Sequence, residues 1–373
     1  MEMISRVIIS GGGTGGHIFP AIAIANEIRK RNPSASILFI GANGKMEMEK
    51  VPQAGYLIEG LNIVGFKRSF SFSNFLLPFK LFGSLWKAKK LIQSFQPELV
   101  IGVGGYASGP TLKMAGWINV PTIIQEQNSF PGKTNLLLAR KAALICTAYP
   151  NMEVFFPKEK IILTGNPVRS ETVDLCNKRE DGLRFYGLES HKKTILIMGG
   201  SLGARTLNNA VCNALSVLND VQDVQVLWQC GQLYFETLNN ELTLPKNVKM
   251  VQFIDRMDFA YAAADLIVSR AGATSISELC IVGKPTFLVP SPNVSEDHQT
   301  KNAKVLVDRE AAVLVTDEEA KESLFRQIFE VLKEEELLLK LTTNINNMGM
   351  PNATIDIVNA CEKILFNSKH QNG

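Results

Sequence analysis

The sequence has few of the residues that build metal sites or disulfide frameworks. Its six cysteines lie far apart with no C-x-x-C pair, and its four histidines include no pair with metal-ligand spacing. This spacing suggests neither a zinc site nor a disulfide framework, so we expect no metal and no disulfide framework. The cysteines then serve as small buried hydrophobic residues.

The sequence also lacks a long apolar run and an excess of either charge. No stretch approaches the ~18 uninterrupted apolar residues of a membrane-spanning helix, and no secretory signal precedes the strand-like residues 7–9. We expect a protein that works in the cytoplasm, soluble or resting on a membrane surface. Lys and Arg total 39 against 36 Asp and Glu, a formal charge of +3. This is too small to indicate a nucleic-acid partner without a local basic cluster, and we expect no nucleic-acid partner.

What the sequence does have is the length and composition of a two-domain globular protein. Its 373 residues are 46% hydrophobic and 20% charged, which suits two domains of ~150–190 residues. Short β-branched runs, glycine-rich turns and helical patterns alternate, as in βα units that form parallel sheets. The predicted class is α/β, with two doubly wound Rossmann-like domains facing across a cleft. The predicted strands cover residues 7–10, 37–40, 99–103 and 122–125, then 194–198, 224–229, 248–253, 266–269 and 286–289.

One segment interrupts regular structure between the two halves. Residues 164–169 contain a glycine and an Asn-Pro step, which favour an irregular linker. We therefore predict an N-terminal domain over residues 1–165 and a C-terminal domain over 166–345. Residues 346–373 contain a Gly-Met-Pro break followed by an amphipathic helical pattern, and we expect that helix to return to the first domain.

A glycine-rich loop at residues 10–17 follows the first strand and precedes a helical pattern at 21–31. Its backbone amides and the helix N-terminus can therefore face an anion. Read as G-x-G-x-x-G, the loop also satisfies the dinucleotide-binding fingerprint. That fingerprint requires an acidic residue at the end of the next strand, where residues 39–42 have no carboxylate. A dinucleotide-dependent oxidoreductase is thus an alternative that lacks its ribose ligand.

Two more glycine loops, at residues 102–110 and 199–205, also follow predicted strands. Any one of them can be an ordinary tight turn, but three such loops at strand ends favour phosphate binding. A fourth segment, residues 269–278, again passes from a strand into a helix. In it Glu278 has two interpretations: it closes a capping box with Ser275, or its carboxylate accepts two ribose hydroxyl groups.

His17 directly follows the first glycine loop, at the edge of the expected cleft. An imidazole there suits a general base with a pKa near neutrality, and the alternative is a histidine that hydrogen-bonds the loop. No Asp-x-Asp motif occurs in the sequence, which argues against transferases that hold a divalent ion through that motif. The charge of a leaving group must then be met by helix N-termini and arginine.

Six segments spread over the whole chain resemble one family. In order they are residues 12–17, 102–110, 126–128, 165–169, 199–201 and 269–273, and they resemble the MurG family of bacterial glycosyltransferases. The resemblance implies the GT-B fold, no cofactor, and inverting transfer of N-acetylglucosamine from UDP-N-acetylglucosamine to lipid I. The acceptor is the C4 hydroxyl of a muramoyl-pentapeptide carried on undecaprenyl diphosphate, and the product, lipid II, serves peptidoglycan synthesis. Another UDP-sugar-using GT-B enzyme is the alternative within this fold.

The resemblance also implies site residues, with the acceptor on the first domain and the donor mainly on the second. His17 becomes the catalytic base, Glu278 the ribose ligand and Gln299 the sugar contact. The implied UDP-N-acetylglucosamine residues are Thr14, Gly15, Gly16, Asn128, Arg169, Ser201, Ile254, Ala273, Thr274, Ser275, Ile276, Ser277, Glu278 and Gln299. The implied acceptor-diphosphate residues are Gly15, Gly16, Gly104, Gly105, Tyr106 and Ser108. Leu202 and His298 depart from the family pattern, in which glutamine occurs at these positions.

Residues 66–90 carry six basic residues, aromatic residues at helical spacing and no acidic residue. A lipid-borne acceptor requires a docking face, and aromatic residues ringed by cations favour an anionic lipid surface. We therefore predict a membrane patch and a peripheral location at the cytoplasmic face of the bacterial plasma membrane. The predicted patch residues are Phe75, Phe79, Lys80, Phe82, Trp86 and Lys87, with Trp117 as a further candidate. The alternatives are aromatic residues packed under the first sheet and a non-catalytic membrane adaptor.

Overall fold

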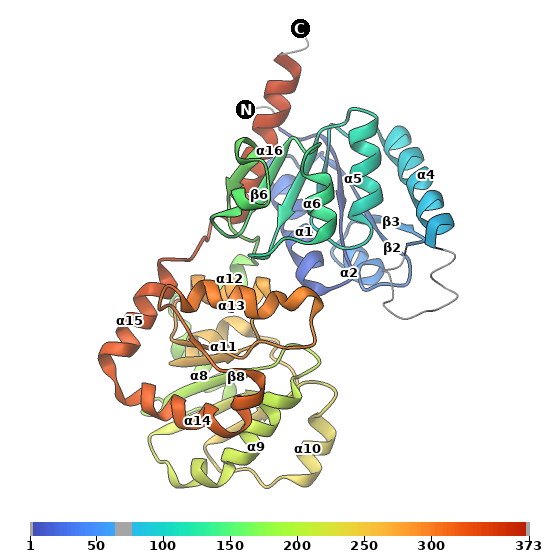
Figure 1. Cartoon of the computed structure of the whole chain (residues 1–373). Coiled ribbons are helices and arrows are strands. Elements are labelled where there is room, and N and C mark those ends of the chain that lie inside the picture. Colours follow the sequence, from blue (N-terminus) through green and yellow to red (C-terminus); the bar gives the residue numbers. More distant parts are fainter. Residues whose placement is uncertain (1–2, 64–76, 371–373) are drawn as a thin grey trace. The chain divides into compact units, whose positions relative to one another are not determined.

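The computed structural model describes residues 3–63 and 77–370 of the chain. The chain divides into two compact units: unit 1 comprises Met1–Val168 and Pro351–Gly373, and unit 2 comprises Arg169–Met350. Each unit contains a parallel β-sheet packed with helices (Figure 1). The predicted α/β class with two Rossmann-like sheets is therefore confirmed.

The sheet of unit 1 has the strand order β3-β2-β1-β4-β5-β6-β7, and every neighbouring pair is parallel. Its central strands are almost continuous runs of buried apolar residues because helices cover both faces. The sequence patterns missed β3, β6 and β7, two of which are edge strands. The strands are β1 (Arg6–Ser10), β2 (Ser36–Ala42), β3 (Leu57–Leu61), β4 (Leu99–Gly102), β5 (Thr122–Glu126), β6 (Leu144–Thr147) and β7 (Ile161–Leu163).

The helices of unit 1 include the C-terminal one. Arg31, at the end of the first helix, donates to Glu362 Oε2 at 2.9 Å and to Asn359 Oδ1 at 2.8 Å. The bond to Glu362 compensates a buried carboxylate, and the two bonds together fix the last helix against the first in the core of unit 1. The helices are α1 (Gly15–Arg31), α2 (Glu47–Gln53), α4 (Leu77–Phe95), α5 (Ser108–Trp117), α6 (Lys133–Leu138), α16 (Ala353–His370) and the short η1 (Met152–Val154) and η2 (Lys158–Lys160).

The sheet of unit 2 has the order β10-β9-β8-β11-β12-β13, again parallel throughout. Trp228 on β9 is fully buried, and its Nε1 donates to Asn208 Oδ1 at 3.0 Å, so the indole nitrogen has the partner that burial requires. The strands are β8 (Lys193–Met198), β9 (Val224–Gln229), β10 (Val248–Val251), β11 (Leu266–Ser269), β12 (Thr286–Leu288) and β13 (Val313–Leu314).

The helices of unit 2 cover both faces of this sheet. They are α7 (Ser170–Val173), α8 (Arg179–Tyr186), α9 (Arg205–Asp220), α10 (Phe235–Glu241), α11 (Met257–Ala263), α12 (Ala273–Val282), η3 (Ser295–Asp297), α13 (His298–Val307), α14 (Asp317–Lys333) and α15 (Glu335–Asn346). The helix α14 begins with a complete capping box, in which Glu319 N donates to Thr316 Oγ1 at 3.3 Å. Its start is therefore set by local sequence.

The two strand orders determine where ligands can bind. In unit 1 the order reverses between β1 and β4, and in unit 2 it reverses between β8 and β11. At such a switch point the loops from adjacent strands leave in opposite directions and open a crevice at the carboxyl ends of the strands. All four predicted glycine segments follow these four strands, so each unit presents its glycine loops at its own switch point.

Candidate active site

The glycine loops after β1 and β4 pack directly against one another. Gly12 N donates to Gly104 O at 3.3 Å, and a Cβ built on Gly105 would lie only 2.2 Å from Gly12 O. Gly13 and Gly104 have φ angles of +89° and +95°, which side chains other than hydrogen rarely allow. These glycines are therefore required for the loops to approach, beyond any contact with a ligand.

His17 lies in the first turn of α1 instead of in the preceding loop. The helix α1 begins at Gly15, whereas the predicted helix began at residue 21. The sequence pattern missed the first turns because Gly15, Gly16 and Pro20 have low helix propensity. The ring packs on the second loop, since a Cβ on Gly104 would lie 2.8 Å from His17 Nε2. The predicted base and the predicted acceptor loop are thus neighbours in unit 1.

The hydrogen bonds of His17 indicate which ring nitrogen carries the proton. His17 Nδ1 lies 3.1 Å from Gly12 O and 3.2 Å from Thr14 Oγ1. A carbonyl oxygen can only accept, so Nδ1 carries the hydrogen and donates it. In that tautomer Nε2 holds the unshared electron pair and is the nitrogen that can accept a proton.

The remaining predicted acceptor residues divide into buried and exposed groups. Ser108 is buried, and its hydroxyl donates to Gly105 O at 2.8 Å. The group that it can still offer to a ligand is therefore its backbone N–H at the start of α5. The Tyr106 side chain is 51% exposed beside it, while Gly15 and Gly16 supply N–H groups in the first turn of α1.

A buried glutamate that the sequence analysis did not assign shapes the loop bearing Asn128. Glu126 ends β5 and accepts hydrogen bonds from Asn128 N at 3.0 Å, Gly132 N at 3.2 Å and Asn135 Nδ2 at 2.7 Å. Burial raises the pKa of the Glu126 carboxyl, and these N–H donors lower it in turn. The signal in the sequence was a carboxylate directly after a predicted strand, because a buried carboxylate must be satisfied by nearby donors.

In unit 2 the glycine loop after β8 is braced by the neighbouring strand. Gln229, the last residue of β9, donates through Nε2 to Gly200 O at 2.8 Å and accepts from Gly199 N at 3.2 Å. Gly203 fits so closely that a Cβ there would lie 2.0 Å from Cys230 O. The loop thus leaves Ser201 exposed at its tip.

The helix α12 offers an uncapped N-terminus at the same switch point. It begins at Ala273 with Gly272 as N-cap, and no side chain of the described residues bonds to that cap. The capping-box interpretation of Ser275 and Glu278 is therefore wrong, because Ser275 lies inside the first turn. Thr274 Oγ1 is buried and has no hydrogen-bond partner within the described part of the chain. Its hydroxyl and the first-turn N–H groups can bind an anion.

Glu278 lies one turn further along α12, where α11 fixes its carboxylate. Tyr261 Oη, on a fully buried side chain of α11, donates to Glu278 Oε2 at 3.1 Å. Burial raises the pKa of Glu278, while the charge of Arg169 and the Tyr261 hydrogen bond lower it. The structure thus brings the two predicted residues Glu278 and Arg169 within electrostatic range and adds Tyr261, which no sequence motif marked.

Two further predicted donor residues occupy loops of unit 2. The Ile254 side chain is buried, so only its backbone can offer the predicted uracil contact. Gln299, near the start of α13, accepts from Ser291 N at 2.8 Å through Oε1, which leaves its amide group as the donor for a sugar hydroxyl. Of the other predicted donor residues, Thr14, Gly15, Gly16 and Asn128 belong to unit 1.

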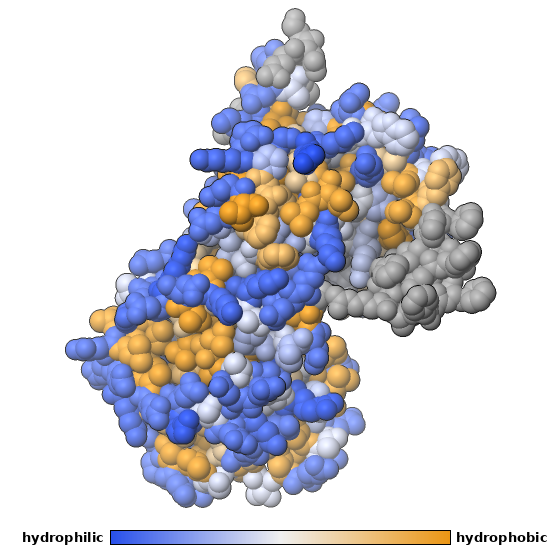
Figure 2. All heavy atoms as spheres, in the orientation of Figure 1, coloured by the Kyte–Doolittle hydropathy of each residue, from blue (hydrophilic) through white to orange (hydrophobic). Residues whose placement is uncertain are grey.

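The membrane prediction falls on α4 and on the neighbouring α5. Ser84, Ala88 and Ile92 form the buried face of α4, while Phe82 and Trp86 are 73% and 64% exposed on the opposite face. Figure 2 shows apolar side chains over α4 on this side of unit 1. Phe75 lies outside the described residues, and so does the side chain of Phe79.

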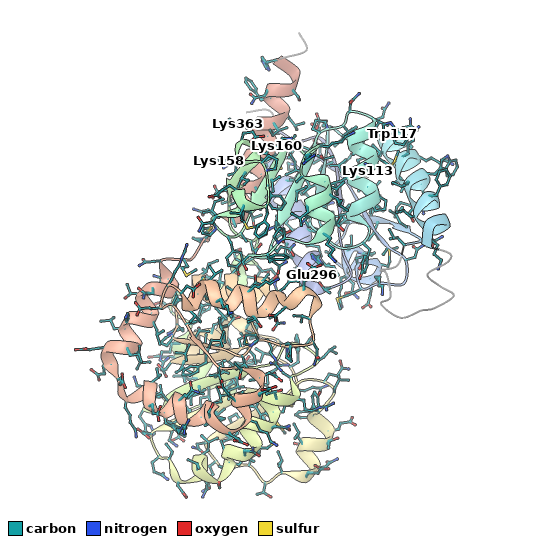
Figure 3. All side chains as sticks on the ribbon, viewed as in Figure 1. Lys113, Trp117, Lys158, Lys160, Glu296 and Lys363 are labelled. Carbon is teal, nitrogen blue, oxygen red and sulfur yellow. The ribbon has the colours of Figure 1, made fainter. Side chains whose placement is uncertain are left out.

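The end of α5 extends this surface. Figure 3 shows Lys113 and Trp117 on α5 alongside α4, and Trp117 is 69% exposed. Lys89 Nζ lies 5.9 Å from the Trp117 ring centroid, and Lys90 Nζ lies 5.8 Å from that of Trp86, both within cation–π range. We call the set formed by the exposed Phe82, Trp86, Lys90, Lys113 and Trp117 and the half-buried Lys89 the α4–α5 face.

Lys87 differs from the other predicted membrane cations. Its Nζ lies 3.1 Å from Glu59 Oε2 and donates to Gly60 O at 2.8 Å. Its charge is therefore compensated by β3, which lies outside the sequence window that suggested the patch.

Among the helices that the structure describes, none is long and apolar enough to cross a membrane. Within the same residues, no group of three or more His, Cys, Asp or Glu side chains could hold a metal ion.

The nearest carboxylate to the first glycine loop bears on the dinucleotide alternative. Glu47, five residues after β2, is buried, and both its oxygens accept backbone N–H groups, from Gly13 at 2.8 Å and Ala42 at 2.9 Å. A ribose ligand must present free acceptor oxygens to solvent. Glu47 therefore does not supply the acidic residue that the dinucleotide fingerprint requires.

Comparisons with known proteins cover both units. The glycosyltransferase family 28 N-terminal domain matches residues 7–147, and the C-terminal domain of that family matches residues 194–355. The chain is 51% identical over 365 residues to the UDP-N-acetylglucosamine–N-acetylmuramyl-(pentapeptide) pyrophosphoryl-undecaprenol N-acetylglucosamine transferase of Flavobacterium psychrophilum, covering 98% of this chain and 99% of that one. The Bacteroides fragilis protein of the same name is 52% identical over 362 residues, with 96% and 95% covered. The crystal structure of Acinetobacter baumannii MurG matches with a TM-score of 0.78 and 29% identity, covering 96% of this chain and 99% of that one.

Proposed function

The chain belongs to the MurG branch of glycosyltransferase family 28, and from that membership we propose its reaction. It is a glycosyltransferase that moves N-acetylglucosamine from UDP-N-acetylglucosamine to lipid I in peptidoglycan synthesis. The acceptor group is the C4 hydroxyl of the muramoyl-pentapeptide, and the anomeric configuration inverts. The product is lipid II.

The observation that carries the donor half is the arrangement of α12. Its N-terminus, with the partnerless Thr274 hydroxyl, is suited to the diphosphate, and Glu278 follows one turn later, held by Tyr261. A carboxylate with one oxygen already occupied still has acceptor positions for two adjacent ribose hydroxyls. Ser201 on the exposed loop tip adds a hydroxyl for the phosphates, and Gln299 presents its amide to the sugar.

The acceptor half resides on the switch point of unit 1. The N–H groups at the starts of α1 and α5 are suited to the acceptor's diphosphate. His17 Nε2 takes the proton of the C4 hydroxyl while that oxygen attacks the anomeric carbon. The bond from this carbon to the β-phosphate oxygen breaks on the opposite side, so UDP leaves with its electron pair and the configuration inverts. The α12 N-terminus and Arg169 stabilise the charge that develops on UDP.

The α4–α5 face is proposed to bind the membrane that carries the acceptor. Exposed indole and phenyl rings insert at the headgroup boundary, and the surrounding lysines attract anionic lipid. The exposure of Phe82, Trp86 and Trp117 argues against the alternative in which these aromatic residues pack under the sheet. On this proposal the chain is a peripheral enzyme at the cytoplasmic leaflet, where undecaprenyl-linked substrate is available.

The reaction is tested by direct transfer. The purified chain is incubated with radiolabelled UDP-N-acetylglucosamine and a lipid I analogue with a short polyprenyl chain, and labelled disaccharide lipid is separated by chromatography. We expect label in the lipid fraction with stoichiometric release of UDP. Release of UDP without label in the lipid would indicate a different acceptor and would support the alternative of another UDP-sugar-using enzyme. No UDP release with any acceptor, together with vesicle binding, would favour the adaptor alternative.

A further inference from the structure

Glu47 forms a buried link beneath the first glycine loop. It is the first residue of α2 and is 1% exposed, and its two carboxylate oxygens accept from Gly13 N and Ala42 N. Gly12 packs so closely on it that a Cβ there would lie 2.2 Å from Glu47 Cδ. A buried carboxylate is costly unless N–H donors surround it, so this one must be compensated by the loop above it.

The peptide group between Gly12 and Gly13 joins this carboxylate to His17. A trans peptide points its N–H and its C=O in opposite directions. Here the N–H of Gly13 points at Glu47, at 2.8 Å, and the C=O of Gly12 accepts from His17 Nδ1, at 3.1 Å. One planar group therefore carries both contacts, and turning it would break both.

We propose that Glu47 is a positioning residue that keeps His17 in the tautomer able to act as a base. By holding the Gly13 N–H, the carboxylate keeps Gly12 O directed at His17 Nδ1, so the ring proton stays on Nδ1 and Nε2 remains the proton acceptor. This inference rests on the proposed role of His17. Glu47 itself acts only through the peptide group and His17.

The two glycines explain why such a residue is needed. Gly12 and Gly13 have φ angles of +148° and +89°, a region in which glycine moves between several conformations at little cost. A flipped peptide would direct the Gly13 N–H at His17 Nδ1, which would then have to accept. The ring proton would move to Nε2 and the base would be lost. A carboxylate that accepts the N–H also polarises the peptide and strengthens Gly12 O as an acceptor.

The test uses Glu47→Gln with Glu49→Gln as matched control. Glutamine keeps the size of the side chain, but its NH₂ group must face one of the two N–H donors, so one hydrogen bond is lost. Glu49 lies on the same helix with its side chain exposed at the surface, so its replacement removes the same charge without touching the loop. The enzyme is labelled with ¹⁵N-histidine, and the His17 signals are identified by their loss in His17→Asn.

In the wild type and in Glu49→Gln, two-dimensional ¹⁵N spectra are expected to show the Nδ1–H tautomer for His17. In Glu47→Gln the Nε2–H tautomer should appear, and kcat with the short-chain lipid I analogue should fall at least about tenfold. The KM for UDP-N-acetylglucosamine should stay near the wild-type value. The conservative variant Glu47→Asp keeps the carboxylate and is expected to retain more of the Nδ1–H tautomer and of kcat than Glu47→Gln.

The outcomes separate this inference from the proposed function. An unchanged tautomer in Glu47→Gln, whatever happens to kcat, overturns the positioning role. A changed tautomer with unchanged kcat supports the structural link but contradicts His17 as the base. If Glu47→Gln does not fold, the tautomer of the wild type and of Glu47→Asp still decides, since Nε2–H in the wild type would contradict the inference directly.

Discussion

Tyr261 Oη donates a 3.1 Å hydrogen bond to Glu278 Oε2 between two adjacent helices of unit 2. This bond fixes the orientation of the carboxylate that we assign to the ribose. A flexible glutamate would have to lose side-chain freedom on binding, whereas a fixed one has lost it already during folding. In the proposed donor site, α11 and α12 therefore hold the ribose ligand in one orientation before the donor binds.

Replacing Tyr261 with Phe is expected to weaken donor binding. The variant removes one hydrogen bond to a charged group, which contributes ~1.5–3 kcal/mol, so the KM for UDP-N-acetylglucosamine should rise about tenfold or more with a smaller change in kcat. Tyr186→Phe is the matched control, because Tyr186 Oη donates to Arg256 O at 3.0 Å outside the proposed donor residues. Equal KM values for the two variants would contradict a role of Tyr261 in donor binding.

Glu278→Gln is expected to weaken donor binding while keeping or gaining stability at neutral pH. Burial raises the pKa of Glu278, so the folded state binds this proton more tightly than the unfolded state does. Its contribution to the free energy of unfolding therefore declines as pH rises from the ordinary carboxyl range through the raised pKa. Glutamine is neutral, so its burial does not carry the cost of a buried charge, and its amide oxygen can still accept from Tyr261. Thermal unfolding at pH 7 should give an equal or higher Tm for the variant, and a clearly lower Tm would contradict this prediction.

The same shift predicts how donor binding depends on pH. The ionised carboxylate is the form that accepts two ribose hydroxyls, so affinity for UDP-N-acetylglucosamine should fall on acidification. The fall should begin above the ordinary range of a glutamate, because the pKa of Glu278 is raised by burial. Calorimetric titrations of the wild type from neutral pH down to the ordinary carboxyl range should show this loss of donor affinity. The donor affinity of Glu278→Gln should not change over the same pH range. A wild-type profile as flat as that of the variant would count against Glu278 as the ribose ligand.

His17→Ala is expected to reduce turnover with little effect on donor affinity. General-base catalysis contributes about 100-fold to 10,000-fold, so kcat at saturating substrates should fall at least about 100-fold. The control is His191→Ala, since His191 is exposed on unit 2 near Glu189. Near-normal turnover of His17→Ala at saturation would show that the histidine only hydrogen-bonds its loop.

Charge reversal on the α4–α5 face is expected to weaken membrane binding. Each cation near an anionic surface contributes about 1 kcal/mol, so Lys89→Glu with Lys90→Glu should lower the partition coefficient at least about 30-fold in vesicle sedimentation. Binding of UDP-N-acetylglucosamine should not change. The same double reversal at Lys193 and Lys246, which are exposed on unit 2, serves as control. Unchanged sedimentation of the first pair would contradict the proposed face.

Much of the fold was predictable because it rests on local patterns. The apolar runs of β1 and β8 and the glycine loops that follow them read directly as βα units, since buried parallel strands need apolar side chains on both faces. The strands β3, β6, β7 and β13 were not predicted. The sequence of β3 mixes polar and apolar residues, and β7 and β13 are only three and two residues long. The strands they pair with stabilise them more than their own propensity does.

The sequence by itself determined the class of fold, the four glycine segments, and the candidates His17 and Glu278, because these depend on residue type and spacing. Only the tertiary structure decided which groups hold them. Glu47 contacts Gly13, Tyr261 contacts Glu278, and Glu59 contacts Lys87, each within about 3 Å. The two members of each pair lie well apart in sequence. Hydrogen bonds and ion pairs of this kind depend on the approach of separate elements, and no periodicity along the chain records that approach.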